Sequence, residues 1–142
     1  MTVDAPSLLS AGVRSFLSAT PPRYATLATI NYDGTPHQIV IWYVLRGEEI
    51  IVNSRHGRRW PANLRRNGRA SITVHEGEDA VTLDCTLDRE YTGDEAQADI
   101  AEMAWRYDAA ETAGVKVARF RGQRRITFVL RPVRAHLHGD PR

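Results

Sequence analysis

The sequence predicts an α+β fold built on an antiparallel, closed β-sheet of six or seven strands, and three observations support this. Most predicted strands are joined by short turns such as Asp33-Gly34, as in antiparallel hairpins. Helical periodicity occurs in three connecting segments, without the regular strand–helix alternation of a parallel sheet. The predicted strand at residues 37–45, HQIVIWYVL, is apolar on both faces. Burial of both faces requires a closed barrel or a second chain, so this pattern predicts a barrel that forms a homodimer.

Length and composition predict one ordinary globular domain over residues 1–142. Apolar residues make up 42% of the chain and charged residues 25%, and the net charge is only +2. No long apolar run and no basic-then-apolar start occur, so we expect neither a membrane span nor a secretory signal. The single cysteine, Cys85, excludes an internal disulfide and is typical of a cytoplasmic protein.

Periodicity and turn residues define the elements of the first third of the chain. Apolar residues recur at helical spacing from Leu8 to Leu17, so we predict a helix from Pro6-Ser7 to the prolines at 21–22. Strands at residues 24–31 and 37–45 then form the hairpin around Asp33-Gly34. Residues 46–49, RGEE, turn the chain into a buried strand at residues 50–54.

A short helix and two strands are predicted next. Pro61 suits a first helical position, because proline lacks only a donor that is unpaired there, and Asn67-Gly68 is a typical helix end. Alternation predicts strands at residues 70–76 and 80–90. The second strand places one apolar set on a single face, namely Val81, Leu83, Cys85 and Leu87.

The last third of the chain contains a helix, a loop and two short strands. Thr92 and Glu95 have the spacing of a capping box, which predicts a helix to about residue 110. Residues 111–116 are predicted to form a loop. Strands follow at residues 126–130 and 133–138, interrupted by Pro132, and the tail from Gly139 is predicted to be loose. A second basic patch precedes these strands and consists of Lys116, Arg119, Arg121, Arg124 and Arg125.

Arginines dominate the stretch from Ile50 to Arg69, IIVNSRHGRRWPANLRRNGR. No acidic residue occurs between Ile50 and His75. The arginines of this stretch are Arg55, Arg58, Arg59, Arg65, Arg66 and Arg69. Because two of them lie beside the predicted N-terminus of a helix, the stretch is suited to holding phosphate or carboxylate groups. A solvated basic loop between two strands is the alternative interpretation.

Several kinds of catalytic site can be set aside. The sequence has no glycine-rich nucleotide-binding motif and no nucleophile elbow. His136 and His138 share one strand face but have no third ligand at useful spacing, so no metal is expected. Such a chain is suited to a bound organic cofactor that carries the reactivity itself, flanked by aromatic groups such as Trp42, Tyr43 and Trp60.

Three segments together resemble a known family: YATLATINYDGTPH, the apolar strand that ends in WY, and VNSRHGRRWPANLRRNGRASITV. They are similar to the pyridoxamine 5′-phosphate oxidase-like split β-barrel family, and within it to actinobacterial flavin- and deazaflavin-dependent oxidoreductases. The resemblance covers residues 8–138. It implies a homodimer that holds FMN or the 8-hydroxy-5-deazaflavin coenzyme F-420 at the subunit interface. F-420 is favoured, because its tail carries several negative charges that suit the arginine-rich stretch.

The resemblance also implies which residues hold the cofactor, with no catalytic side chain and no metal. Arg58 falls on the phosphate-binding arginine of the family. Many relatives have lysine where this chain has Trp60, which could stack on the cofactor ring or plug the dimer seam. The full implied set is Gln38, Val40, Trp42, Asn53, Ser54, Arg58, Arg59, Trp60 and Asn63.

The function implied by the resemblance is hydride transfer between the bound cofactor and a small organic acceptor such as a quinone, a tetrapyrrole or a nitro-compound. A non-catalytic flavin-, deazaflavin- or haem-binding or carrier protein of the same fold is the alternative. A nucleic-acid binder is disfavoured, because aromatic residues are not interleaved through the basic patches and the overall charge is nearly balanced.

Overall fold

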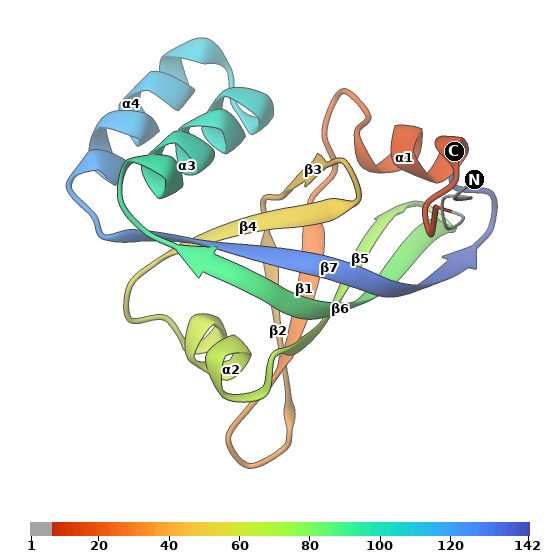
Figure 1. The fold of residues 1–142 in the computed structure, drawn as a ribbon. Coiled ribbons are helices and arrows are strands. Elements are labelled where there is room, and N and C mark those ends of the chain that lie inside the picture. Colours follow the sequence, from red (N-terminus) through yellow and green to blue (C-terminus); the bar gives the residue numbers. More distant parts are fainter. Residues whose placement is uncertain (1–6) are drawn as a thin grey trace, which may run out of the picture.

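The computed structural model describes residues 7–142, which form a curled antiparallel sheet with helices at its periphery (Figure 1). The order of the seven strands is β2-β1-β5-β6-β7-β4-β3. The predicted α+β fold with seven antiparallel strands is therefore confirmed. The edge strands β2 and β3 do not pair with each other within the described residues, so the sheet is a half-barrel rather than the closed barrel that was predicted.

The elements follow one another through residues 7–142 in the order α1-β1-β2-β3-β4-α2-β5-β6-α3-α4-β7. Their bounds are α1 Ala11–Leu17, β1 Ala25–Ile30, β2 Pro36–Ile41, β3 Val44–Arg46, β4 Glu49–Arg55, α2 Arg59–Asn67, β5 Arg69–Glu76, β6 Asp79–Tyr91, α3 Asp94–Tyr107, α4 Ala110–Arg121 and β7 Arg125–His138. Among these helices none combines the length and apolar character needed to cross a membrane.

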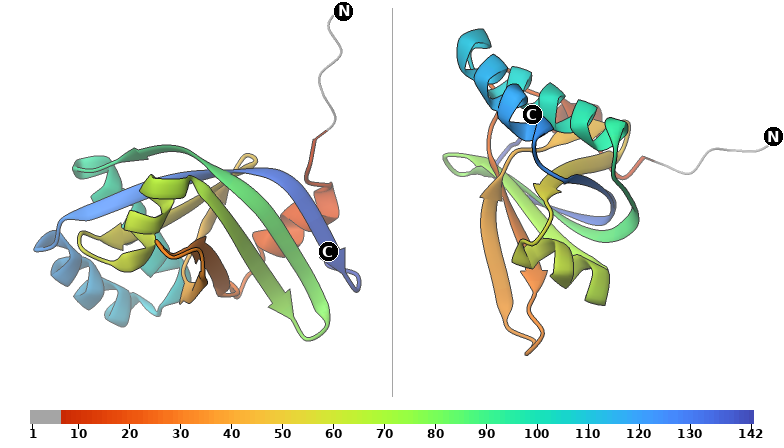
Figure 2. Two further views of the ribbon diagram at one scale, coloured as in Figure 1. Left: turned by 90° about the horizontal axis from the view of Figure 1, so that it is seen from below. Right: turned by 90° about the vertical axis from the view of Figure 1, so that its left-hand side faces the viewer.

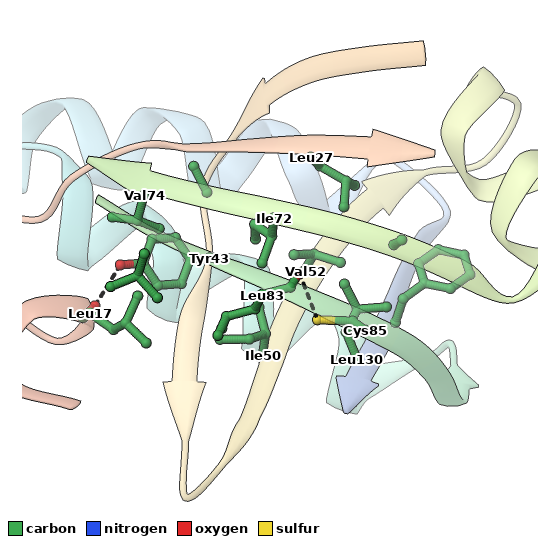
Figure 3. Packing of buried hydrophobic residues seen from close by; sticks show 14 of the residues in the cluster. Leu17, Leu27, Tyr43, Ile50, Val52, Ile72, Val74, Leu83, Cys85 and Leu130 are labelled. Carbon is green, nitrogen blue, oxygen red and sulfur yellow. Dashed lines mark hydrogen bonds between the residues drawn. The ribbon is translucent and has the colours of Figure 1, made fainter. Parts of the chain in front are cut away.

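The main core lies inside the curl of the sheet. Alternate residues of the strands point inward, and Leu27, Ile72 and Leu83 are at most 1% exposed (Figure 3). Helix α1 packs its buried side chains onto the same core, and the Tyr43 hydroxyl donates a hydrogen bond to the carbonyl oxygen of Leu17 over 2.6 Å. Figure 2 shows how the long strands β6 and β7 bend around this interior.

A second core joins the α3–α4 helix pair to the opposite face of β4 and β7. Ile51 and Val129 are register partners on these two strands, and both belong to this core. Met103 of α3 and Phe120 of α4 pack in the same cluster. The second core therefore fixes α4 beside the end of the sheet where β4 ends and β7 begins.

Helix α4 corrects the prediction of a loop at residues 111–116. Ala113, Val117 and Phe120 recur at helical spacing, and all three pack in the second core. Gly114, inside the predicted loop, lies on the exposed side of the helix, where a glycine costs about 1 kcal/mol and is tolerated.

Two strand predictions also differ from the structure. The strand predicted at residues 37–45 is divided, since β2 ends at Ile41 and β3 begins at Val44. Strand β7 instead runs unbroken through Pro132. Pro132 pairs with Cys85 next to a register shift, and β4 no longer pairs with β7 at this point, so the missing N–H of proline is tolerated.

Three predicted helix starts are displaced. Helix α1 begins at Ala11 with Ser10 as its cap, whose Oγ accepts from the Val13 N–H over 3.1 Å; Pro6 lies outside the described residues. Helix α2 begins at Arg59, two residues before Pro61. The capping box predicted at Thr92 does not form, because Gly93 is the N-cap of α3 and no side chain caps it.

The helix stop at Gly68 and the β1–β2 hairpin are confirmed. Gly68 has φ +76°, the left-handed conformation that favours glycine at a helix end. Strand β2 pairs with β1 alone, and Val40 on it is 63% exposed. The two-sided burial predicted for this strand is therefore not met within one chain, and the homodimer remains a prediction.

Candidate functional site

A cleft of about 300 Å³ lies where α4 approaches β2, β4 and the start of β7. Its residues are Tyr24, Val40, Ile41, Trp42, Asn53, Ser54, Arg58, Trp60, Ile100, Met103, Lys116, Arg119, Phe120 and Arg125. A larger hollow of about 660 Å³ opens over β1, β5, β6 and β7, but its two arginines share it with Asp84. Among residues 7–142 no acidic residue lines the smaller cleft, so its positive charge makes it the stronger candidate site.

Guanidinium groups converge on this cleft from three elements. Arg58 lies at the N-cap of α2, Arg119 near the end of α4 and Arg125 at the start of β7. Arg55 on β4 is the register partner of Arg125, which places like charges opposite each other across two strands. Among the ion pairs of residues 7–142, none joins a carboxylate to any of these four arginines. An anionic ligand would relieve their repulsion.

Arg125 is the most buried of these cations, with only 8% of its surface exposed. Its Nε donates to Asn53 Oδ1 over 2.9 Å and its Nη1 donates to Gln123 Oε1 over 2.8 Å. Its guanidinium carbon lies 4.7 Å from the centre of the Phe120 ring. Burial, and then the neighbouring arginines 58, 55 and 119, lower the pKa of the Arg125 guanidinium to about 10. A lowered pKa means that the folded protein disfavours the charged form, so a bound anion should stabilise the protein.

We predict that inorganic phosphate raises the melting temperature of the ligand-free protein. Phosphate at ten times its dissociation constant adds about 1.4 kcal/mol of stability, or roughly 5 °C for a chain of this size. Differential scanning fluorimetry at pH 7 measures the shift, with sodium chloride at equal ionic strength as the control. An equal shift in chloride would mean that the cluster responds to screening alone.

Aromatic side chains form one wall of the cleft. The Trp42 and Tyr107 rings stack with centroids 5.4 Å apart, and Tyr107 stacks in turn on Tyr24 at 5.3 Å. Lys116 Nζ lies 4.9 Å from the Trp42 ring and 2.8 Å from Asp108 Oδ2. Trp42 is therefore held by the protein's own groups and serves as a fixed wall with only part of its surface available to a ligand.

The structure brings six of the nine predicted binding residues to the cleft. These are Val40, Trp42, Asn53, Ser54, Arg58 and Trp60. The Asn53 side chain does not face open space, because its Nδ2 donates to the Ala96 carbonyl oxygen and to Thr127 Oγ1, both over 3.0 Å. Its Oδ1 accepts a hydrogen bond from Arg125. The Asn53 amide therefore holds a side chain of the cleft in place.

Gln38, Arg59 and Asn63 do not line the cleft. Gln38 lies further along the exposed edge strand β2. Asn63 is 3% exposed and donates to Thr29 Oγ1 over 3.0 Å, so it ties α2 to β1. Arg59 lines a separate hollow beside Asp33. The helix begins at Arg59 rather than Pro61, and the consecutive residues Arg58 and Arg59 line different hollows as a result.

Trp60 and Tyr43 belong to the core rather than to a ring-stacking surface. Trp60 is 1% exposed, and its ring lies 5.3 Å from that of Phe128 at a tilt of 60°. The sequence left two alternatives for Trp60, stacking on the cofactor ring or filling the subunit interface. Both need an exposed indole, and neither is met. Tyr43 is fully buried and packs in the core inside the sheet.

Eight of the fourteen lining residues were not predicted, and four of these lie on α4 or directly after it. Lys116, Arg119 and Phe120 lie on α4, and Arg125 follows directly after it. The sequence contained their signal as the second basic patch. The patch could not be connected to Arg58 because no helix was predicted over residues 110–121.

Other reactive groups lie away from the cleft. Burial first, and then Asp84, raise the pKa of the Cys85 thiol to about 12, which agrees with its prediction as a core residue. His136 Nε2 lies 3.0 Å from Asp84 Oδ2 on the exposed face of the sheet. Within residues 7–142, no three metal-ligating side chains come together.

The fold and the cleft define a split-barrel protein. Arginines and no acidic residue among those described line its cleft, which lies where α4 approaches β2, β4 and the start of β7. The chain belongs to the pyridoxamine 5′-phosphate oxidase family, whose family model matches residues 9–138. This confirms the family expected from the sequence motifs.

Solved structures with the same fold were also found. An F420 reductase is 22% identical, with a TM-score of 0.72 over 90% of this chain and 98% of that chain. A conserved hypothetical protein from Mycobacterium tuberculosis is also 22% identical, with a TM-score of 0.73 over 98% of this chain and 91% of that chain. A haem-binding protein from Mycobacterium smegmatis is 26% identical, with a TM-score of 0.62 over 95% of this chain and 55% of that chain. Comparison with curated protein sequences gave no match.

Proposed function

We propose that this protein is an oxidoreductase that binds coenzyme F-420 or FMN in the arginine-lined cleft and passes a hydride to a small organic acceptor. The observation that supports this most strongly is the group of guanidiniums of Arg58, Arg119 and Arg125, which form no ion pair within the described part of the chain and surround a hollow with an aromatic wall. F-420 is favoured over FMN, because a cluster with this much positive charge suits a tail with several negative charges better than one phosphate. The structural likeness to an F420 reductase is consistent with this choice.

Each side of the cleft has a distinct task in this proposal. Arg58 and Arg119 are exposed, so their guanidiniums can turn toward phosphate or carboxylate oxygens and donate charge-assisted hydrogen bonds. Val40 and Phe120 provide apolar surface that keeps water from one side of a bound ring. The bound, reduced coenzyme would supply the hydride, and a proton from water would complete reduction of the acceptor. The protein's own contribution is binding, orientation and exclusion of water, which requires no catalytic side chain.

A homodimer would complete the cleft. Tyr24 is 56% exposed and Val40 is 63% exposed at this site. Val40 also lies on the edge strand β2, which pairs only with β1 within residues 7–142 and belongs to the predicted strand that is apolar on both faces. A second copy of the chain over these residues would bury them and enclose the ligand on its open side.

Binding of haem or flavin without turnover is the second candidate, and it is supported by the likeness to a haem-binding protein. Histidine and cysteine are common protein ligands of haem iron, and neither type lines the cleft. Tyr24 and Met103 are the cleft residues able to ligate iron, and Met103 is only 1% exposed. The residues of the cleft therefore favour a ring held by its anionic groups over a ring held by its metal.

We predict that Arg58→Ala weakens binding of F-420 about tenfold, because it removes one charge-assisted contact to the ligand. Titration of F-420 and of FMN into the purified protein, followed by quenching of cofactor fluorescence, measures the effect. Arg134→Ala is the matched control, since it removes the same charge from an exposed position on β7 that faces a different hollow. Equal affinities of the two variants would remove Arg58 from the binding site.

Turnover is measured separately with the cofactor that binds more tightly. Reduced cofactor is mixed with a quinone, a tetrapyrrole and a nitro-compound, and its oxidation is followed by absorbance. Oxidation that depends on both protein and acceptor supports the enzyme. Tight binding without oxidation of the cofactor by any acceptor supports the carrier protein instead.

A further inference from the structure

A chain of hydrogen bonds runs from the cleft into the second core. Arg125 Nε donates to Asn53 Oδ1 over 2.9 Å, and Asn53 Nδ2 donates to Thr127 Oγ1 over 3.0 Å. The Thr127 hydroxyl donates in turn to Asp99 Oδ2 over 2.7 Å. Asn53 and Thr127 are register partners on β4 and β7, and Asp99 lies on α3. Every donor in this series of hydrogen bonds points away from the cleft and toward the carboxylate of Asp99.

The carboxylate of Asp99 sets the direction in which this series of hydrogen bonds is donated. Asp99 is only 5% exposed and is held by Arg46 Nη2 at 2.6 Å and by the Tyr91 hydroxyl at 2.6 Å. An ionised carboxylate only accepts hydrogen bonds, so the single proton of Thr127 must point toward Asp99. Thr127 Oγ1 is then free to accept, and it and the Ala96 carbonyl oxygen both require the NH₂ side of the Asn53 amide. The Asn53 oxygen is therefore turned toward the cleft.

Arg125 needs this oxygen because its other neighbours repel it. Arg58, Arg55 and Arg119 all act on its guanidinium electrostatically, and no carboxylate of residues 7–142 forms an ion pair with it. Burial also removes it from the water that would solvate an exposed arginine. Asn53 and the neutral Gln123 are its hydrogen-bond acceptors within the described residues. Loss of the Asn53 oxygen would allow the guanidinium to turn away from the cleft.

We propose that Asp99, Thr127 and Asn53 form a positioning relay that holds Arg125 in the orientation that binds the anionic part of the ligand. This proposal rests on the proposed cofactor site and assigns to Asn53 a supporting role in place of direct contact with the ring. Thr127 has no surface exposure, so it acts on the ligand only through Asn53 and Arg125.

The test is Thr127→Val, which keeps the shape of the side chain and removes the hydroxyl. The dissociation constant of F-420, measured by fluorescence quenching, is expected to rise roughly tenfold. Thr127→Ser restores the hydroxyl and is expected to restore the affinity, although it loses a buried methyl group and lowers the melting temperature. Thr127→Ser then combines a lowered melting temperature with wild-type affinity, so affinity follows the hydroxyl and not the stability, which a purely structural role for Thr127 does not explain.

The matched control is Thr73→Val, which removes a strand hydroxyl that bonds to Thr82 Oγ1 at 2.8 Å and does not line the cleft. Its affinity for F-420 should equal that of the wild type. Wild-type affinity in Thr127→Val would overturn the relay. If Thr127→Val does not fold, Asn53→Ala removes the oxygen that accepts from Arg125 and is expected to weaken binding to a similar degree, and wild-type affinity in that variant also overturns the relay.

The relay and the proposed function fail in different ways. A wild-type protein that binds neither F-420 nor FMN contradicts the proposed function. The relay is then judged with inorganic phosphate, read as the rise in melting temperature. Loss of that rise in Thr127→Val with recovery in Thr127→Ser supports the relay, and an equal rise in both variants overturns it.

Discussion

Replacement of Arg125 by glutamine is expected to reduce the affinity for F-420 or FMN about 100-fold. Arg125 is 8% exposed, and it lines the hollow proposed to hold the cofactor, which no acidic residue among residues 7–142 lines. Loss of a hydrogen bond between charged, desolvated groups costs up to about 3 kcal/mol, which corresponds to about two orders of magnitude in the dissociation constant. The effect should exceed that of Arg58→Ala, because Arg58 is exposed and solvated.

The same substitution should change the stability of the ligand-free protein by less than about 1 kcal/mol. Glutamine loses hydrogen bonds to Asn53 and Gln123, but it also removes a buried charge that three other arginines repel. Urea unfolding of the ligand-free protein and fluorescence titration of the cofactor measure the two quantities. Arg124→Gln is the matched control, because the adjacent Arg124 is exposed and does not line the cleft. Affinity within threefold of the wild type would contradict the assignment of Arg125.

Replacement of Trp60 by alanine is expected to destabilise the fold by about 3–5 kcal/mol, the usual cost of removing a large aromatic side chain from a core. Trp60 is 1% exposed and packs with Phe128 and Leu64 in the core inside the sheet. Because small domains are stable by only about 5–15 kcal/mol, the variant should unfold at a much lower urea concentration. Circular dichroism during urea titration measures the change.

The control for this experiment is Trp105→Ala on α3, where the indole is 54% exposed and the expected loss is under about 1 kcal/mol. Trp60→Phe should lose less stability than the alanine variant, because it keeps an aromatic side chain at the position. The opposite pattern for Trp60→Phe, near wild-type stability with a large loss of cofactor affinity, would return Trp60 to the ring-stacking role.

The parts of the fold that the sequence predicted correctly are those with local causes. The turn at Asp33-Gly34 joins β1 to β2, and Gly68 ends α2 with a positive φ, because both depend on a few consecutive residues. The alternation of Val81, Leu83 and Cys85 placed the buried face of β6 correctly. Helix starts were less predictable, since Ser10 and Gly93 cap α1 and α3 where other residues offered equally good local signals.

The candidate site likewise contains residues that the local sequence predicted and residues that only tertiary packing brings together. Asn53, Ser54 and Arg58 lie within a few residues of each other, and the arginine-rich sequence around them predicted an anion site there. Arg119 and Arg125 are more than sixty positions away from Arg58 and reach the cleft only because α4 packs through Phe120 onto the second core. Arg59 and Asn63 lie as close to Arg58 in the sequence, yet α2 directs them elsewhere.

The sequence by itself determined the antiparallel α+β fold, the family and the concentration of arginines in one loop, because turn chemistry, periodicity and local charge are properties of neighbouring residues. The tertiary structure alone decided which arginines meet, that Trp60 fills the core, and that Asn53 supports Arg125 from behind. These outcomes depend on the pairing of β4 with β7 and on the packing of the α3–α4 pair against them. Contacts between residues far apart in the chain follow from how the elements bury their apolar faces together, and no local pattern records that arrangement.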